Sequence, residues 1–457
     1  MACKPEDILG KAGTGAVLSL DAVGMQDTYL TSNTGNSFFQ FTNTKHTHFT
    51  KHSASIQVNT DSSPNWPFNR ILTVQFRPKE MGDILQNMYI KCTLPSLVDP
   101  SGGPPLGQYC DNVGLAMINQ IQLAADDMIL EVIKADWNVV YTELYYTIEE
   151  YRAWIIANNV DPIKGGDVYI PLHFFFSRRH SSSFTANPVY HDSFYFKQGF
   201  LMCAAHNHRN LILTVTFNPV TFFSSAPSVT LSNFYVVTEE IILGGAERNY
   251  LKNTIQKNTI TFTRNESVYP VVNSPITANM TPNCPVKVIH WFMRKKKYEN
   301  ANDPTYFNNR FNFSSLDYRL PFSDSSTITQ QETNYPVLSE SILYLNGVQL
   351  NVLSQSVRTT NRRDGSYYYK FIQPLSHGLC VPSRNIYTYS FSIRPADPQP
   401  SGSLDFSQMD STTTFINASI YSPTDTRSTI PYNMYIFYSG FNTITYSNGL
   451  VSLDFGW

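Results

Sequence analysis

Short runs in which apolar and polar residues alternate recur along most of this chain. In residues 211–217, every second side chain is apolar, and Thr214 and Thr216 occupy positions between them. The same alternation marks residues 258–263, 341–346, 385–394 and 432–438. Because successive strand side chains point to opposite faces, this period of two predicts half-buried β-strands. The chain has 27 prolines and 22 glycines, and turn residues of this kind between many short strands favour antiparallel sandwiches or barrels.

One segment follows a helical period instead. Residues 136–157 predict a single amphipathic helix that begins at Asp136 as its N-cap. Its apolar positions are Trp137, Val140, Tyr141, Leu144, Tyr145 and Ile148. A second short helix is expected at residues 245–256, after a strand at residues 229–243. This second helix has few apolar residues, so we interpret it as a connector between domains.

The length of 457 residues exceeds what one ordinary core supports, so more than one domain is expected. Residues 119–123 and 340–345 resemble each other weakly, which is consistent with two copies of one sandwich. The expected organisation is an N-terminal arm (1–25), a first domain (26–244), the connector (245–256) and a second domain (257–457).

Composition narrows the class of partner. The formal net charge is −2, which provides no electrostatic footprint for nucleic acid or an anionic membrane. Charged residues amount to 15% of the chain, below the roughly 25% of an average soluble domain, and aromatic residues reach 14%. Such a chain must bury much surface in cores or against other subunits, which favours an oligomer.

Cysteine usage and the N-terminus indicate the compartment. The six cysteines are Cys3, Cys92, Cys110, Cys203, Cys284 and Cys380, and their spacing fits neither a disulfide framework nor a zinc ribbon. We therefore expect reduced thiols. The first residues lack the apolar core of a signal peptide, and no apolar run reaches the ~20 residues of a membrane helix. A protein that is neither secreted by the usual route nor membrane-spanning is expected.

Two motifs resemble ligand sites but miss a required element. Residues 10–15 contain Gly-Lys, but Ala12 stands where a P-loop needs Ser or Thr, and no strand precedes the motif. The pairs His46/His48 and His206/His208 could each point to one face of a strand and bind zinc. No Cys, Asp or Glu close in sequence completes either pair, so solvated or interface histidines are favoured.

The remaining polar clusters also lack a catalytic pattern. The carboxylates of Asp126/Asp127 and Glu149/Glu150 are adjacent in sequence and therefore diverge, which favours solvated surface. The basic clusters at residues 178–180 and 294–297 are interpreted as solvated strand ends or subunit contacts rather than as nucleic-acid sites. Glycosylation sequons occur at Asn265, Asn279, Asn312 and Asn417, and without a signal peptide we expect no ordinary glycan on them. No catalytic, cofactor-binding or metal-binding residue is predicted, and no enzyme.

Several segments resemble the major capsid proteins of nucleocytoplasmic large DNA viruses. The most specific is residues 398–410, PQPSGSLDFSQMD, within a matching stretch at residues 387–410. Other matching segments are residues 21–49, 136–144, 170–178 (read as a strand), 345–347, 373–374 and 446–448. Two positions depart from the family pattern, because Asp405 stands where the family usually has Asn and Gln408 where it usually has Arg.

The resemblance implies an all-β double jelly roll: two tandem eight-stranded antiparallel β-sandwiches with short helices in loops. It also implies a structural protein whose homotrimers form pseudo-hexagonal capsomers of an icosahedral shell, without cofactor. The expected partners are further copies, penton and minor capsid proteins, and inner membrane components contacted by the arm, with no direct nucleic acid. The expected location is the virion, after assembly in the host cytoplasm. Outward loops and trimer contacts are expected at residues 94–112, 305–333 and 354–367.

Two other readings remain open at the sequence level. The first is a double-jelly-roll scaffold or minor capsid protein, which copy number per virion would distinguish. The second is a glycan-binding or glycan-cleaving β-sandwich, since sugars stack on Tyr and Trp. A retaining hydrolase needs two carboxyl groups about 5 Å apart, which a sequence does not reveal.

Overall fold

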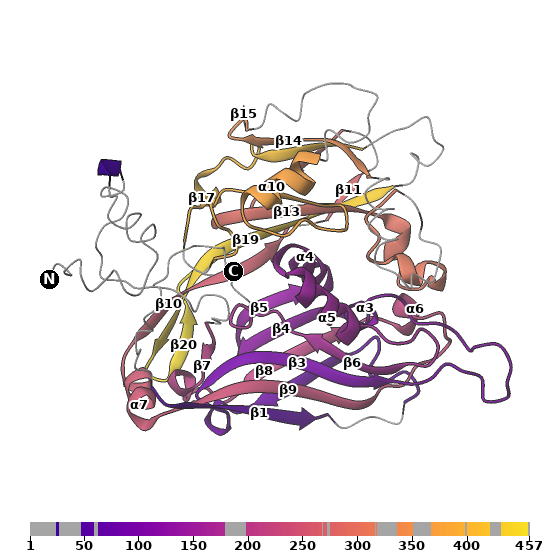
Figure 1. Cartoon of the computed structure of the whole chain (residues 1–457), viewed down its shortest axis with the longest axis horizontal. Helices are drawn as coiled ribbons and strands as arrows, with labels where there is room; N and C mark the ends of the chain where they lie inside the picture. Colours follow the sequence, from indigo (N-terminus) through magenta and orange to yellow (C-terminus); the bar gives the residue numbers. More distant parts are fainter. Residues whose placement is uncertain are drawn as a thin grey trace, which may run out of the picture. The chain divides into compact units, whose positions relative to one another are not determined.

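The alternating segments form four antiparallel β-sheets in the computed structural model of the chain (Figure 1). The structure describes residues 24–26, 47–58, 63–178, 198–266, 268–271, 275–315, 317, 336–350, 367–397, 400–420 and 431–455. Residues 48–457 make one compact unit, separate from residues 1–47. The arm predicted at residues 1–25, including the motif at 10–15, lies almost wholly outside the described residues.

Two of the sheets make the first sandwich, which spans residues 49–243. One sheet has the order β1 (Phe49–Gln57), β9 (Ser232–Leu243), β3 (Ile84–Leu94) and β6 (Gly166–Pro171), with β7 (Phe200–Leu201) on β3. The other has the order β2 (Ile71–Phe76), β8 (Leu211–Phe217), β4 (Ile118–Ala125) and β5 (Met128–Lys134). Side chains of both sheets, such as Ile90 and Leu213, pack into one core.

The other two sheets make the second sandwich, which spans residues 256–453. One sheet has the order β10 (Gln256–Asn265), β19 (Tyr432–Ser447), β13 (Pro285–Lys295) and β16 (Ile386–Ser390). It also carries β11 (Tyr269–Val271), β17 (Leu404–Asp405) and β20 (Leu450–Leu453). The facing sheet has the order β12 (Ile276–Asn279), β18 (Phe415–Ile420), β14 (Leu338–Leu345) and β15 (Val348–Gln349). Both sandwiches thus have two four-stranded paths, which confirms the predicted all-β double jelly roll.

Short helices connect the strands, as predicted. The α-helices are α3 (Val113–Met117), α4 (Ala135–Tyr145), α5 (Ile148–Asn158), α6 (Val220–Phe223), α7 (Gly245–Asn253) and α10 (Gln373–Ser376). The 3₁₀ segments are η2 (Pro78–Glu80), η3 (Cys203–Ala205), η4 (Lys296–Glu299), η5 (Pro304–Asn309) and η8 (Phe406–Gln408), and η7 (Tyr368–Ile372) is a π-helix. The helix α7 confirms the short helix predicted at residues 245–256.

The single helix predicted for residues 136–157 is wrong. The chain leaves the helical conformation at Tyr146, and Thr147 then caps α5 through a capping box with Glu150. The capping box satisfies free backbone donors at the start of α5 and so allows a second helix to begin there. The apolar period observed in the sequence therefore runs across two helices. The predicted N-cap is also wrong, because Lys134 occupies that position and Asp136 lies in the first turn of α4.

Two predicted strands are shorter than expected. The strand predicted at residues 170–178 ends with β6 at Pro171, and the chain then turns so that Phe174 and Phe176 enter the core. The Ser177 hydroxyl stabilises this turn by donating to the carbonyl of Leu172 at 2.6 Å. The strand predicted at residues 385–394 ends at Ser390. In contrast, β8 has the predicted bounds and the predicted alternation of buried positions.

The two sandwiches share a continuous apolar contact, and α4 lies within it (Figure 1). The core of the first sandwich extends into the second through Phe292, Ile386 and Phe437. Trp137 of α4 places its ring 5.8 Å from the rings of both His290 and Phe437. Because α4 is buried on almost every side, polar groups at its ends must find partners in the second sandwich.

Candidate functional site

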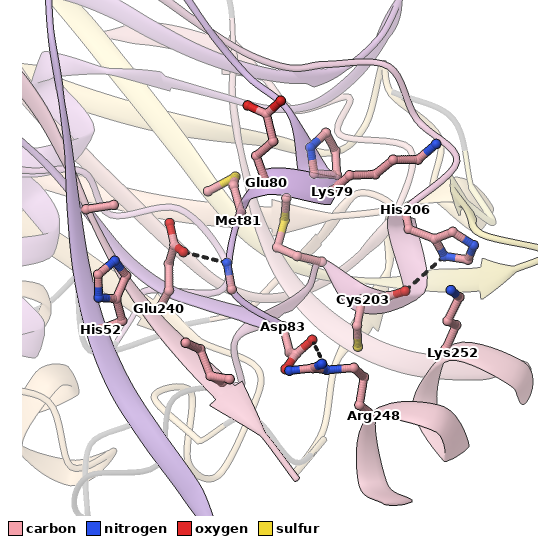
Figure 2. A pocket seen from close by; sticks show the side chains of 15 residues that line it. His52, Lys79, Glu80, Met81, Asp83, Cys203, His206, Glu240, Arg248 and Lys252 are labelled. Carbon is pink, nitrogen blue, oxygen red and sulfur yellow. Dashed lines mark hydrogen bonds and ion pairs between the residues drawn. The ribbon is translucent and has the colours of Figure 1, made fainter. Parts of the chain in front are cut away.

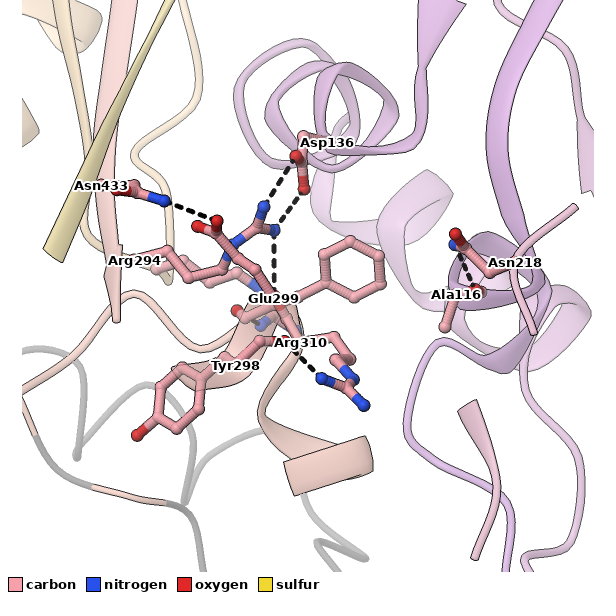
Figure 3. A network of polar contacts seen from close by, with 10 residues as sticks. Ala116, Asp136, Asn218, Arg294, Tyr298, Glu299, Arg310 and Asn433 are labelled. Atoms are coloured by element: carbon pink, nitrogen blue, oxygen red, sulfur yellow. Dashed lines mark hydrogen bonds and ion pairs between the residues drawn. The ribbon is translucent and has the colours of Figure 1, made fainter. Parts of the chain in front are cut away.

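A set of charged side chains, all buried except the half-buried Asp136, joins the two sandwiches, and we refer to it as the polar junction (Asp136, Glu143, Arg294, Arg310 and Arg384). Asp136 lies in the first turn of α4 and accepts two hydrogen bonds from Arg294 of β13, at 2.7 and 3.2 Å (Figure 3). Arg294 also pairs with Glu299, whose carboxylate accepts from Asn433 at 2.6 Å. Burial lowers the pKa of Arg294, but Asp136 raises it well above its ordinary value.

Among the described residues, the hydrogen bonds of the Arg310 guanidinium all go to backbone carbonyls. Arg310 is 1% exposed and donates at 2.6–3.2 Å to five carbonyl oxygens, those of Thr221, Phe222, Tyr298, Asn300 and Asp303. Two of these carbonyls belong to α6 of the first sandwich and the others to the second. Burial lowers the pKa of Arg310 to about 10. A planar fork with five donors suits this task, and Lys could not replace it.

Glu143, at the other end of α4, makes the third connection. Its carboxylate accepts from the backbone N–H of Ser383 at 2.7 Å, from the Tyr151 hydroxyl at 2.8 Å and from Arg384 at 3.3 Å. Arg384 in turn donates to the carbonyl of Phe311. Ser383 and Arg384 precede β16, so this cluster attaches α4 to the second sandwich. Both ends of α4 are therefore held by charge-assisted hydrogen bonds.

The two basic clusters predicted as solvated or subunit-contacting are mostly buried, and that prediction is wrong for their main members. Arg178 pairs with the buried Glu131 and donates to the carbonyl of Thr261 at 2.7 Å. Arg294 belongs to the polar junction, and the 2% exposed Lys295 pairs with Asp317 at 2.7 Å. The pKa of Asp317 is about 2, because hydrogen bonds from its neighbours outweigh the effect of burial. Arg179 and His180 lie outside the described residues.

In the histidine pair His206/His208, both ring nitrogens of His208 already have partners within the chain. Nε2 of His208 accepts from the backbone N–H of Val451 in β20 at 2.8 Å, so Nδ1 donates to Asp126 at 2.9 Å. Backbone hydrogen bonds to Asn210 and Arg209 and the contact with His208 outweigh burial, so the pKa of Asp126 is below its ordinary value. The Asp126 carboxylate is partly exposed, as predicted, but it also binds His208. Within the described ranges no group of three or more His, Cys, Asp or Glu could hold a metal ion, and His46 lies outside them.

The most specific segment of the sequence is a structural joint. In its described part, residues 400–410, the Ser401 hydroxyl accepts from the backbone N–H of Arg394 at 2.9 Å. Strand β17 then pairs with β13, and Phe406 is buried against Phe391 and Tyr438. The backbone N–H of Asp410 donates to Asn346 at 2.9 Å, which fastens the segment to the β14–β15 hairpin.

The two departures from the family pattern leave this joint intact. The Asp405 carboxylate accepts from the backbone N–H of Ser407 at 3.0 Å, a bond that an Asn oxygen could accept equally well. Gln408 is exposed. Pro398 and Gln399, at the start of the segment, lie outside the described residues.

Replacing Gly402 with alanine is expected to lower the free energy of unfolding by about 1–2 kcal/mol. Its φ of +127° disfavours a side chain, and a Cβ would lie 3.0 Å from the carbonyl oxygen of Phe391. Chemical denaturation would measure the loss. Gly245→Ala is the matched control, because nothing lies within 4 Å of that Cβ and alanine favours helix α7. Equal midpoints for the two variants would show that position 402 accepts a side chain without cost.

Lys287 of β13 is buried, and burial strongly lowers its pKa. Burial and the nearby Arg178 lower the pKa of Lys287 to about 7, and its ammonium donates to the Thr261 hydroxyl at 3.0 Å. The same burial lowers the pKa of His290 to about 3, so this imidazole stays neutral while it contacts Tyr145 and Thr388.

Lys287→Met is expected to raise the free energy of unfolding at pH 7 by about 2 kcal/mol. The unfolded chain holds the lysine proton up to about pH 10.5 and the folded chain only to about pH 7. The wild type therefore gains stability as pH rises from 7 to 10.5, and the advantage of the variant shrinks over that window. Urea denaturation at pH 7 and pH 10 measures this difference, and a constant advantage would reject the buried charge as its cause.

A cavity of about 520 Å³ with several charged residues in its walls lies at one end of the first sandwich (Figure 2). Its walls include Asp83, which pairs with Arg248 at 2.7 Å, and Cys203. Burial raises the pKa of Cys203 to about 11, so the thiol is protonated at neutral pH and is not an activated nucleophile. The cavity therefore offers charge and shape rather than an acyl-transfer site.

Other described features bear on the sequence expectations. Cys92, Cys110, Cys203, Cys284 and Cys380 are free. Asn312 is fully buried and donates to Asn309, which leaves no room for a glycan, whereas Asn265 and Asn279 are exposed and Asn417 is half-buried. In the part of the chain that the structure describes, no helix is long and apolar enough to cross a membrane.

Comparison with known families gives two matches along the chain. Residues 242–452 match the model of the large eukaryotic DNA virus major capsid protein, and residues 37–197 match that of the major capsid protein N-terminus. Together these matches cover more than three quarters of the chain.

Curated relatives agree with these matches. The major capsid protein of Paramecium bursaria Chlorella virus 1 is 24% identical over 411 residues, which is 87% of this chain and 86% of the relative. The major capsid protein of Pyramimonas orientalis virus is 22% identical over 470 residues, which is 95% of this chain and 100% of the relative.

Solved structures share the fold. A quasi-atomic model of the PBCV-1 virus capsid superposes with a TM-score of 0.67 at 16% identity, over 92% of this chain and 100% of that one. The Faustovirus major capsid protein superposes with a TM-score of 0.65 at 11% identity, over 94% and 96%.

Proposed function

Because the chain belongs to the major capsid proteins of large eukaryotic DNA viruses, we propose that three copies form one pseudo-hexagonal capsomer. Such capsomers tile the icosahedral shell of the virion, and the protein acts as a structural subunit without catalytic activity. The observation that carries this proposal is the tandem of two similarly built sandwiches held together by the polar junction.

The geometry of one chain supports the trimer. Each sandwich has two facing sheets with the same four-stranded path, so one chain offers two similar wedges. Three chains related by a three-fold axis present six wedges, which suits a lattice with near-hexagonal packing. The wedges must keep a fixed angle for such tiling, and buried charge pairs at both ends of α4 resist rotation between them.

Size measurement of the purified protein tests the proposal. We expect about three times the chain mass of 51.9 kDa in light scattering coupled to size exclusion. A stable monomer at micromolar concentration would contradict the capsomer. Quantification of intact virions adds a second test, because a low copy number would favour a scaffold or minor component instead.

We further propose the domain organisation and partners of the subunit. The arm comprises residues 1–25, the first jelly roll 26–244, the connector 245–256 and the second jelly roll 257–457. The arm would face the interior of the shell and contact minor capsid proteins or inner membrane components, whereas the capsomer edges would contact neighbouring capsomers and pentons. We expect the subunit not to bind nucleic acid directly. We expect its assembly to take place in the host cytoplasm. Labelling of the arm from outside intact virions would contradict its inward placement.

A further inference from the structure

We propose that the cavity end of the first sandwich is a docking site for an extended acidic segment of another protein. The site has two parts, a groove of unpaired cations and the free edge of strand β1. The proposal deepens the proposed function and rests on it only for the placement of this end on the inner side of the shell. The contacts that form the site belong to the described residues alone.

The groove consists of two neighbouring cavities. The larger, of about 520 Å³, is lined by His52 of β1, Lys79 of η2 and Lys252 of α7, among others (Figure 2). A second cavity of about 270 Å³ shares His206 and Lys252 with the first. The shared residues make the two cavities one extended depression, which is longer than a single small ion requires.

The carboxylates in the wall already have partners. Asp83 pairs with Arg248 at 2.7 Å, and Glu80 pairs with Arg77 at 3.1 Å. Glu240 is 4% exposed and accepts from the backbone N–H of Gly82 at 2.5 Å and from the Thr238 hydroxyl at 2.6 Å. Asp83 and Glu80 are thus each offset by an arginine, whereas Glu240 is held by neutral donors and keeps its negative charge in the wall.

The lysines of the groove are free to bind an anion. Within the described residues, the side chains of Lys79, Lys252 and His52 have no hydrogen-bond or ion partner. Figure 2 shows these side chains on different sides of the cavity. Their spread favours several carboxylates along a chain over one compact anion, because each cation then meets its own negative group.

Strand β1 supplies the second part of the site. It is nine residues long, almost fully exposed, and pairs only with β9 among the described strands. His52 and Ala54 of this strand line the groove. A long exposed edge is ordinarily shortened, charged or covered, because its unpaired backbone groups accept a further strand. An added strand would place alternate side chains on the groove side.

These two parts favour a polypeptide over a phosphate or lipid headgroup. Only a polypeptide can use the backbone donors and acceptors of the β1 edge. The groove lies near the start of β1, where the backbone N–H of Gly244 donates to the carbonyl of His48 at 3.2 Å. An inner-face partner with an acidic strand-forming segment fits this position.

The test uses the full-length protein and a labelled, end-blocked peptide of alternating Glu and Val, nine residues long. We expect saturable binding in fluorescence anisotropy at low salt. Lys79→Glu combined with Lys252→Glu should weaken the dissociation constant at least tenfold, whereas the control Lys164→Glu should change it less than twofold. Lys164 is an exposed lysine of the same sandwich, in a turn beside the opposite end of β3. A peptide with Pro at its three central Val positions should bind at least tenfold more weakly, because Pro cannot pair with the edge.

Several outcomes would overturn the proposal. Equal binding by the wild type and the double variant would reject the groove, and equal binding of the two peptides would reject the strand edge. Binding of inorganic phosphate or of phosphatidylserine vesicles with no binding of the peptide would assign the cations to an anion or membrane contact instead. Size measurement of the same samples distinguishes failure of the docking proposal from failure of the capsomer proposal. If the protein is a trimer that does not bind the peptide, only the docking site is rejected. If the protein is a monomer, the capsomer is rejected.

Discussion

Replacing Arg310 with methionine is expected to lower the free energy of unfolding by about 3–5 kcal/mol. Methionine keeps much of the volume but removes every donor, so five buried carbonyl oxygens lose their partner. The variant also removes a cation whose burial is unfavourable, as its pKa of about 10 shows. The loss of donors outweighs this gain, because several carbonyls cannot all reach water at a side chain that is 1% exposed.

Urea denaturation at a fixed protomer concentration measures the loss. The free energy of unfolding of Arg310→Lys should lie between those of the wild type and Arg310→Met, since an ammonium has three donors and no planar fork. Arg77→Met is the matched control, because the pair of Arg77 with Glu80 is 70% and 67% exposed and should contribute little. A change below 1 kcal/mol in Arg310→Met would show that the carbonyl cluster does not stabilise the contact of the two sandwiches.

Asp136→Ala is expected to lower the free energy of unfolding by about 3–4 kcal/mol. It removes the bidentate partner of Arg294, whose guanidinium is only 7% exposed and then keeps Glu299 at 3.4 Å. Arginine stays protonated at neutral pH even where it is buried, so the side chain cannot lose its charge to escape this cost. The damage should be concentrated where α4 meets β13, and a trimer that depends on a fixed angle between wedges should become less stable as well.

A double-mutant cycle isolates this pair. Asp136→Ala combined with Arg294→Met leaves no unpaired buried charge, so the double variant should be more stable than Asp136→Ala alone. Denaturation of all four proteins gives the coupling energy, and light scattering of the same proteins reports trimer content. Additive losses would show that Asp136 and Arg294 stabilise the protein independently of each other.

The local elements were predictable where one face is buried and the other is not. Residues 211–217 become β8 with the predicted alternation, since the side-chain period of two decides which face enters the core. The same reasoning failed at residues 170–178, where a run of phenylalanines fits a strand or a buried turn equally well. It also predicted one helix where two are present. The helix breaks before Thr147, where the capping box starts α5, but the apolar pattern continues through the break.

The polar junction could not be found from the sequence. Asp136 and Arg294 lie 158 residues apart, and Glu143 and Ser383 lie 240 apart. A cluster of Arg and Lys after a strand ordinarily indicates a solvated end, and only the packing of the second sandwich on α4 buries it. The one available signal was the low share of charged residues, which implied extensive buried surface without saying which charges it included.

The sequence by itself determined the class of this protein. Alternating apolar runs, frequent turn residues and the segment at residues 398–410 were sufficient for the double jelly roll and the capsid family, because these signals are local. The tertiary structure alone decided what that segment and the basic clusters do. Residues 400–410 join β13 to a hairpin, and Arg294 and Lys295 hold buried ion pairs. The physical reason is that burial and partner choice depend on contacts between distant residues, which a local pattern does not contain.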